Sequence, residues 1–192
     1  MTQTVSNVTA AKPAVGGAIS TAPTGTSVPT DAVTKLAAGF KGLGYISDDG
    51  MTNENTRESE EIKAWGGDVV ATPQTSKTDK FKYKLIEVLS VDVLKEVFGQ
   101  SNVTGDLATG IKVQVNSKEL DERVTVIDMI LTDGVLKRIV IPKGKIVEMS
   151  EIPYKDSEVS GYEVTVQAFP DSNGNTHYEY MKSAATSASG GA

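Results

Sequence analysis

The stretch FKYKLIEVLSVDVLKEVFG, residues 81–99, predicts a strand followed directly by a short helix. In its first half the apolar residues Phe81, Tyr83 and Leu85 alternate with lysines. This period of two is typical of a strand with one buried face and one face in water. In its second half the apolar residues share one stripe of a helix instead. We therefore expect a sheet with a helix packed against it.

Two segments are predicted to be helical. The helix within SVDVLKEVFG has Ser90 as a candidate N-cap and ends at Gly99. A second helix is expected over PTDAVTKLAAGF, residues 29–40, with Thr30 as its N-cap. Both are short, so strands make up most of the predicted fold.

The remaining apolar segments are predicted to be strands. RVTVIDMIL, residues 123–131, is apolar on both faces apart from Asp128, which is typical of a central strand. KRIVI and KIVEM flank PKG, residues 142–144, whose proline and glycine predict a break or turn between two strands. YEVTVQAF and HYEYM enclose PDSNGNT, in which Asn-Gly at residues 173–174 predicts a β-hairpin.

The predicted fold class is mainly β (α+β): a β-sandwich or partly closed barrel with a flanking α-helix. A chain of 192 residues suits one domain with a single core. Its first residues are rich in Thr, Ser, Ala, Gly and Pro, and such a composition has too little apolar surface to order itself alone. We expect an N-terminal arm over residues 1–21, a β-sandwich domain over residues 22–182 and a flexible C-terminal tail over residues 183–192.

Charge and composition exclude several function classes. The chain carries a formal net charge of −6, whereas tight sequence-independent nucleic-acid binding needs clustered Lys and Arg. No apolar stretch approaches the roughly 20 residues that cross a bilayer, so no membrane partner is expected. The chain has no cysteine, which rules out a disulfide framework and thiolate metal sites.

Few residues suggest chemistry. His177 is the single histidine and is expected to be an ordinary strand residue. DSNGNT resembles the start of a calcium loop, but Thr176 stands where glycine is needed and Lys182 where a bidentate glutamate is needed. No catalytic residue, metal or cofactor is therefore predicted.

The carboxylates of SDDG and ESEEIKAW are interpreted as parts of a solvated loop. In the alternative of a hydrolase, they would act as a general acid and base. That chemistry would require Asp48, Asp49, Glu60 and Glu61 to converge on one site.

The only tryptophan lies in EEIKAWGGDVV, residues 60–70. A tryptophan beside glycines is more often a packed anchor next to closely approaching backbone than a platform for a ligand. We interpret Trp65, Gly66 and Gly67 as a corner packed in the core or in an interface.

Three stretches resemble a known family in order as well as in wording. They are APTGTSVPTDAVTKLAAGFKGLGYISDDGMT, EEIKAWGGDVVATPQTSKTDKFKYKLIEVLSVDVLKEVFG and KRIVIPKGKIVEMSEIPYKDSEVSGYEVTVQAFPD. Over residues 15–175 the chain resembles the major tail protein (tail tube protein) of long non-contractile-tailed bacteriophages, particularly those of Gram-positive and actinobacterial hosts. A contractile-tail or secretion-system tube subunit is the close alternative, and a surface binding module is the more distant one.

The resemblance implies a structural virion protein with no active site and no cofactor. Subunits of this family form hexameric rings that stack into a tube around the tape-measure protein, and DNA leaves through the lumen without specific binding. Tail terminator and tail-tip proteins are further expected partners. The implied fold is similar to phage tail tube and type VI secretion tube proteins, whose inner sheets join into a barrel around the channel. The expected location is the phage tail, with assembly in the host cytoplasm.

Two sets of residues are predicted to serve this assembly. The polar loop around residues 47–61 and the N-terminal arm are expected to mediate ring stacking, with Trp65 fixing the corner after the loop. Acidic residues on otherwise apolar strands are expected to face a net negative lumen, because a carboxylate there needs water or a partner. Asp128 equally fits an ion pair within the fold. The stacking candidates are Ser47, Asp48, Asp49, Asn53, Glu54, Arg57, Glu60 and Glu61, and the lumen candidates are Asp128, Glu148 and Glu163.

Overall fold

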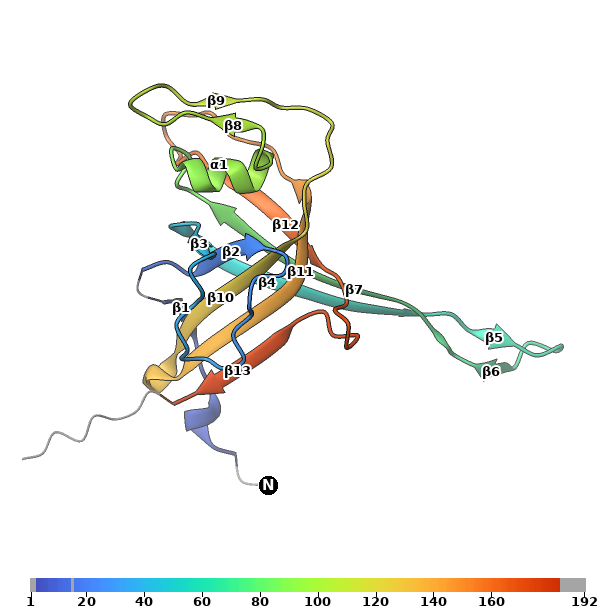
Figure 1. Ribbon diagram of the computed structural model, residues 1–192. Coiled ribbons are helices and arrows are strands. Elements are labelled where there is room, and N and C mark those ends of the chain that lie inside the picture. The colour runs from blue at the N-terminus through green and yellow to red at the C-terminus, as the bar shows by residue number, and fades with distance from the viewer. Residues whose placement is uncertain (1–2, 15, 184–192) are drawn as a thin grey trace, which may run out of the picture.

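The computed structural model describes residues 3–14 and 16–183. Strands dominate this part of the chain, and it contains one α-helix (Figure 1). In chain order the elements are η1 (Val5–Asn7), β1 (Ala11–Pro13), β2 (Ile19–Pro23), β3 (Lys41–Gly42), β4 (Ile46–Ser59), β5 (Ile62–Lys63), β6 (Val69–Ala71), β7 (Gln74–Leu85), α1 (Val91–Phe98), β8 (Val103–Thr104), β9 (Lys112–Val113), β10 (Arg123–Leu131), η2 (Thr132–Gly134), β11 (Leu136–Met149), β12 (Tyr162–Ala168) and β13 (Tyr178–Lys182).

One antiparallel sheet forms the body of the subunit (Figure 1). Its strands follow the order β3, β2, β10, β11, β12, β7 and β4, with β1 added beside β10 and β13 beside β11. β11 links the two halves, because its first residues pair with β10 and β13 and its last residues pair with β12. The sheet ends at β3 and β4 and does not close into a barrel. The expected mainly β fold with a flanking helix is confirmed.

The core gathers apolar side chains from both halves of the sheet and from α1. Phe81, Tyr83 and Leu85 of β7 are all buried in it, as their alternation predicts. The prediction of a central strand over residues 123–131 is also confirmed, because β10 lies between β2 and β11. Further core residues include Ile19, Val93, Val97, Ile127, Ile141, Val164 and Val166.

The helix predicted within residues 90–99 is confirmed. Ser90 is the N-cap residue of α1, and Gly99 ends the helix with a φ of 102°, a backbone conformation that favours glycine. The apolar stripe of α1 faces the core, since Val93, Leu94 and Val97 are buried. Short-range pattern and tertiary packing agree here.

The helix predicted over residues 29–40 is wrong, because this segment forms bends and turns. The Asp31 carboxylate accepts hydrogen bonds from the backbone N–H groups of Val33 and Thr34, a local turn that competes with a helix. Arg138 of β11 donates to the carbonyl oxygens of Asp31 and Thr34, which would be acceptors in the first turn of the predicted helix. Tertiary hydrogen bonds therefore override the local helical pattern.

The break predicted at residues 142–144 is also wrong, because β11 continues through Pro142. Opposite β10, Ile141 pairs with Thr125 and Gly144 pairs with Arg123, so β11 carries one extra residue at this point. Such a bulge tolerates a proline, since it releases one residue from the ladder of hydrogen bonds. Proline and glycine mark an irregularity within one strand here, rather than its end.

The β-hairpin predicted at residues 173–174 does not form, although the turn does. Gly174 has a φ of 79°, and its N–H donates to the carbonyl of Asp171. β12 and β13, however, both pair antiparallel with β11 and follow one another along the same edge. The turn therefore belongs to a loop that links two successive strands along one edge of β11 without reversing the chain.

The expected N-terminal arm differs from the observed structure. β1 and β2 both belong to the main sheet, and Ile19 is fully buried, so the sequence-based boundary at residue 21 falls inside β2. Of the expected C-terminal tail, residues 184–192 lie outside the described residues.

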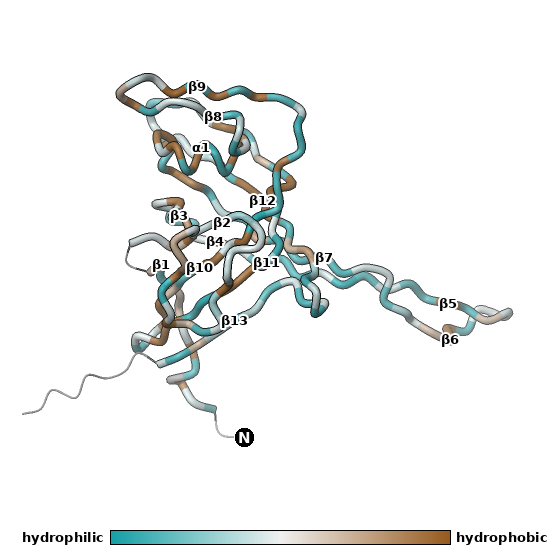
Figure 2. The backbone as a smooth tube through the Cα atoms, viewed as in Figure 1, coloured by the Kyte–Doolittle hydropathy of each residue, from teal (hydrophilic) through white to brown (hydrophobic). Residues whose placement is uncertain are grey.

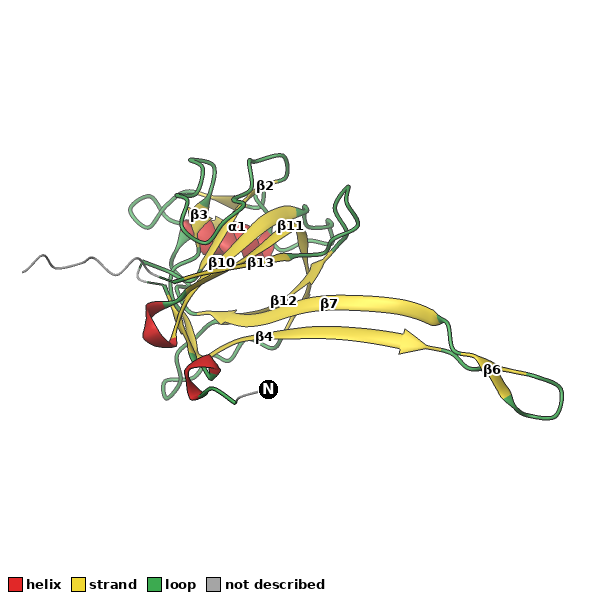
Figure 3. Cartoon of the chain, turned by 90° about the horizontal axis from the view of Figure 1, so that it is seen from below, coloured by secondary structure: helices red, strands yellow, loops and turns green. Residues whose placement is uncertain are grey.

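The predicted acidic loop is a strand. β4 covers residues 46–59 and pairs with β7 over most of its length. The two strands leave the body together and end in the small β5–β6 hairpin (Figures 1 and 3). Runs of charged residues had suggested a loop, but cross-strand hydrogen bonding stabilises an extended hairpin.

Candidate assembly surfaces

The most exposed feature of the subunit is a projecting arm, defined here as residues 54–78. Most of its residues are exposed, and Figure 2 shows hydrophilic colours along most of its length. Polar contacts cross between its strands: Ser76 Oγ donates to Glu58 Oε2 at 2.8 Å, and Arg57 Nη1 donates to Gln74 Oε1 at 3.0 Å. The arm is therefore ordered by strand pairing and polar contacts without a core of its own.

The tip of the arm carries the tryptophan. The chain reverses at Trp65, Gly66 and Gly67, where the two glycines have φ values of 117° and 101°. Trp65 is fully exposed, at 107% of its reference surface, so the interpretation as a core residue is wrong in the subunit. The three residues form a turn at the far end of the arm, and exposed Ile62, Val69 and Val70 lie in the adjoining β5 and β6.

A polar face covers the side of β4, β7, β12 and the end of β11 that is opposite to the core. Its register brings Lys82 beside Thr52 and Thr165, and Glu148 beside Thr165. Lys82 Nζ lies 2.8 Å from Glu163 Oε1. The members of this polar face are Thr52, Glu54, Lys80, Lys82, Lys84, Glu148, Glu163 and Thr165.

Glu163 is held as a carboxylate on the polar face. Hydrogen bonds from Lys82, and then from Ser150 Oγ at 2.6 Å, lower its pKa below the ordinary value. The same contact raises the pKa of Lys82. Lys82 and Glu163 therefore neutralise each other on this face.

A buried carboxylate lies where the arm leaves the body. Asp79 of β7 is 1% exposed and accepts hydrogen bonds from Asn53 of β4 and from Thr176. His177 Nδ1 lies 2.6 Å from Asp79 Oδ2, and its ring packs edge-on against Phe81. Burial alone would raise the pKa of Asp79, but the hydrogen bonds from Thr176, Asn53 and His177 outweigh it and lower the pKa.

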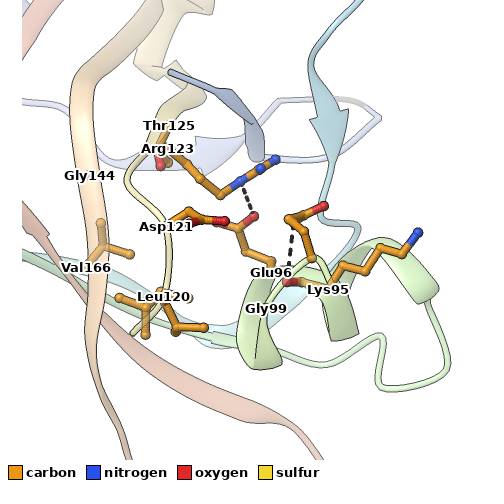
Figure 4. A pocket seen from close by; sticks show the side chains of 11 residues that line it. Lys95, Glu96, Gly99, Leu120, Asp121, Arg123, Thr125, Gly144 and Val166 are labelled. Atoms are coloured by element: carbon orange, nitrogen blue, oxygen red, sulfur yellow. Dashed lines mark hydrogen bonds and ion pairs between the residues drawn. The ribbon is translucent and has the colours of Figure 1, made fainter. Parts of the chain in front are cut away.

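A second buried carboxylate joins α1 to the sheet (Figure 4). Glu96 Oε2 accepts a hydrogen bond from Thr21 Oγ1 at 2.8 Å and lies 2.7 Å from Arg123 Nε. The Arg123 Nε–H is not aimed at the carboxylate, so the contact is an ion pair and Nε itself makes no hydrogen bond. Burial raises the pKa of Glu96, and Arg123 and Thr21 oppose that shift. A small cavity beside them lies between α1 and β10–β12.

The family model for phage tail tube proteins matches residues 4–191. The chain belongs to the phage tail tube protein family. No individually curated protein matched the chain. Family membership makes this tail tube chain a structural component of the phage tail that assembles with itself and other tail proteins into a tube.

The structure separates the predicted stacking residues of this tail tube chain. Ser47, Asp48 and Asp49 lie in the part of β4 next to the body, whereas Glu60 and Glu61 follow its far end. Along an extended strand, Asp49 and Glu60 are about 35 Å apart. The four carboxylates of the hydrolase alternative therefore do not converge. Asn53 belongs to the Asp79 cluster, and Glu54 and Arg57 lie in the projecting arm.

The three lumen candidates have different surroundings in the tail tube subunit. Asp128 forms a two-pronged ion pair with Arg138, the alternative that the sequence had left open, and Arg138 also contacts the 31–34 segment. Asp128 is therefore satisfied within the fold. Glu148 and Glu163 both lie on the polar face and are partly or fully exposed.

Sequence reasoning missed the two buried carboxylates, Asp79 and Glu96, and underrated His177. Glu96 lies beside apolar residues on the α1 stripe, and Asp79 continues the alternation of Phe81 and Tyr83, so both patterns held a signal of burial. The described residues contain no group of three His, Asp or Glu placed to hold a metal ion. Within the same part of the chain, no helix is long and apolar enough to cross a membrane.

Proposed function

We propose that this chain forms hexameric rings that stack into the phage tail tube, through which DNA is ejected. The observation that carries the proposal is the projecting arm, a long polar hairpin that ends in exposed Trp65. Such an apolar tip has no use in an isolated subunit and fits a contact with a second copy. We propose that the arm, together with residues preceding β1, makes the contact between rings.

Stacking along an axis requires a heterologous contact, in which the tip of one subunit meets a different surface of the next. A tryptophan at the centre of such a contact contributes strongly, because it buries a large apolar surface and donates one hydrogen bond. Ile62, Val69 and Val70 extend this surface on both sides of the tip. The stacking role that the sequence assigns to the region before Glu61 thus moves outward, to the end of the arm.

Closure within a ring is proposed to use two sheet edges. β4 pairs only with β7, and β11 beyond Gly144 pairs in the sheet only with β12, over the part of the chain that the structure describes. If β4 of one subunit adds to the end of β11 in the next, the order β11, β12, β7, β4 repeats around the ring. Each subunit then satisfies the exposed edge of its neighbour.

In that ring the polar face would line the lumen, with Glu148 and Glu163 among its charges. The lysines of this face stand beside glutamates, and Lys82 is already paired with Glu163. A wall whose lysines stand beside carboxylates has less affinity for phosphate than one with free lysines, so DNA would pass without being held. A net negative lumen remains our prediction for the complete wall.

The partners follow from the same proposal. The tape-measure protein would occupy the lumen before ejection, and the tail terminator and tail-tip proteins would contact the ends of the tube. Assembly is proposed to take place in the host cytoplasm, and the finished protein to reside in the virion tail.

Electron microscopy of the purified protein tests the proposal directly. We expect rings or tubes for the unchanged chain and folded, unassembled subunits for Trp65→Ala. Tyr154→Ala, which removes another highly exposed aromatic side chain outside the arm, is the matched control and should assemble normally. A protein that stays monomeric at high concentration would contradict the proposal and favour a binding module.

A further inference from the structure

At the base of the arm, just outside residues 54–78, β4 and β7 meet at one buried carboxylate, Asp79. On β7, Asp79 continues the inward-facing series of Phe81 and Tyr83, and it is the last buried residue before the strand leaves the body. Across the ladder, Asn55 pairs with Asp79, and every β4 residue beyond it is exposed. The direction of the arm is therefore set at this point.

Three separate segments meet at the Asp79 carboxylate. Asn53 Nδ2 of β4 donates to Oδ1 at 2.9 Å. Thr176 Oγ1 donates to Oδ2 at 2.5 Å, and His177 Nδ1 lies 2.6 Å from the same oxygen. The group consisting of Asp79, Asn53, Thr176 and His177, called the base cluster here, thus ties both strands of the hairpin to the loop between β12 and β13.

That loop is itself ordered by a local network. The Asp171 carboxylate accepts hydrogen bonds from the N–H groups of Asn173 and Asn175 and from the hydroxyl of Tyr178. Because the loop is fixed at both ends by strands paired with β11, it gives the base cluster a rigid point of attachment. This explains why the Asn-Gly turn is present although the strands around it do not form a hairpin.

The base cluster contributes more to the order of the arm than to the stability of the body. A buried carboxylate is costly unless it is fully hydrogen-bonded, so its partners are held in one arrangement. The body has a large apolar core to stabilise it, whereas the arm has only its strand pairing, the polar contacts between its strands and this cluster at its base. Loss of the cluster would free the hinge between arm and body while leaving the core packed.

We propose that Asp79, Asn53, Thr176 and His177 are positioning residues that fix the direction in which the arm leaves the subunit, and thereby its register with the next ring. Only the second part of this inference, the register with the next ring, rests on the proposed stacking role of the arm. The order of the arm in a free subunit is independent of that role and can be measured without any tube.

Hydrogen exchange of unassembled subunits, followed by mass spectrometry, tests the cluster. In the double variant Thr176→Val/His177→Phe, which keeps side-chain volume and the ring against Phe81, exchange should accelerate about tenfold in the segments at the arm base. Amides of β10 and the first half of β11 should keep their rates. The single variant His177→Asn keeps Thr176 and places a donor near the position of Nδ1. Its exchange at the arm base should stay as slow as in the unchanged chain.

Thr125→Val is the matched control, since it makes the same substitution at a buried position of β10. It should leave exchange at the arm base unchanged. Unchanged exchange in the double variant, or an equal acceleration across the whole sheet, would overturn the positioning role. If the double variant loosens the arm but the unchanged chain forms no tubes, the cluster stands and the proposed function fails.

Discussion

β4 and β7 run through two regions of the molecule that differ in almost everything except strand pairing. In the body, β7 places every second side chain in the core, and Phe81 and Leu85 are fully buried. In the projecting arm the same two strands are exposed on both faces. The difference teaches that burial of apolar side chains stabilises the body. The apolar side chains of the arm lie instead at its tip, where only another molecule can cover them.

The largest effect that separates the two regions is expected from truncating apolar side chains. Leu85→Ala should lower the free energy of unfolding by about 3 kcal/mol, because it leaves a cavity in the core. Val70→Ala, an exposed site in the arm, should change it by less than about 0.5 kcal/mol. Denaturant titration of unassembled subunits measures both, and comparable losses for the two variants would contradict the comparison.

Charged pairs should show the same contrast between body and arm with an effect of similar size. Arg123→Ala leaves the Glu96 carboxylate buried without its cation, which should cost about 3 kcal/mol. Replacing both partners, as in Glu96→Leu/Arg123→Met, should recover most of that loss. Glu61→Gln breaks an exposed pair with Lys63 and should have almost no effect. The prediction fails if the double variant is less stable than Arg123→Ala.

Acid should loosen the arm base before the core. The pKa of Asp79 in the folded chain lies below its ordinary value of 3.8, so its ionised form adds stability at neutral pH. That stability is lost as the pH falls through the ordinary value and then through the lower folded value. Exchange at the arm base should therefore accelerate below about pH 4, relative to amides of β10. Asp79→Asn should remove this pH dependence, and a persistent dependence would assign it to another group.

The smallest effect on subunit stability is expected from deleting residues 1–8. The segment precedes β1 and includes exposed Val5 and Val8, so the free energy of unfolding should change by less than about 0.5 kcal/mol. Polymerisation should nevertheless fall, because this segment is proposed to take part in the contact between rings. Normal tubes from the shortened chain, seen by electron microscopy, would exclude it from that contact. Deleting residues 1–21 would be a poor test, since it removes buried Ile19 and most of β2.

Predictions from short-range sequence patterns succeeded where the residues predicted to be buried do face the core. The alternation of Phe81, Tyr83 and Leu85 and the apolar stripe of α1 were read correctly because both surfaces are covered by the same core. The pattern failed at residues 29–40, where Arg138 binds the carbonyls that a helix would use. It also failed at Pro142, which a bulge accommodates within β11. In both places the deciding partner is distant in the sequence.

The assembly surfaces were predictable only in part. The polar run before Trp65 was predicted to be a loop that mediates ring stacking. Its strand character depends on pairing with residues 74–85, which supplies hydrogen bonds that no local pattern specifies. Trp65 was expected to be packed because isolated tryptophans usually are. Glycines on its C-terminal side instead turn the chain at the arm tip and leave the ring exposed.

The sequence by itself determined a mainly β chain with one helix after β7, an acidic net charge and the resemblance to tail tube proteins, because these depend on composition, periodicity and residue order. Only the tertiary structure decided that Asp128 pairs with Arg138, that Asp79 gathers three segments at the arm base, and that β12 and β13 share one edge of β11. These features arise from contacts between distant segments, and those segments come together only when the sheet forms and packs on its core.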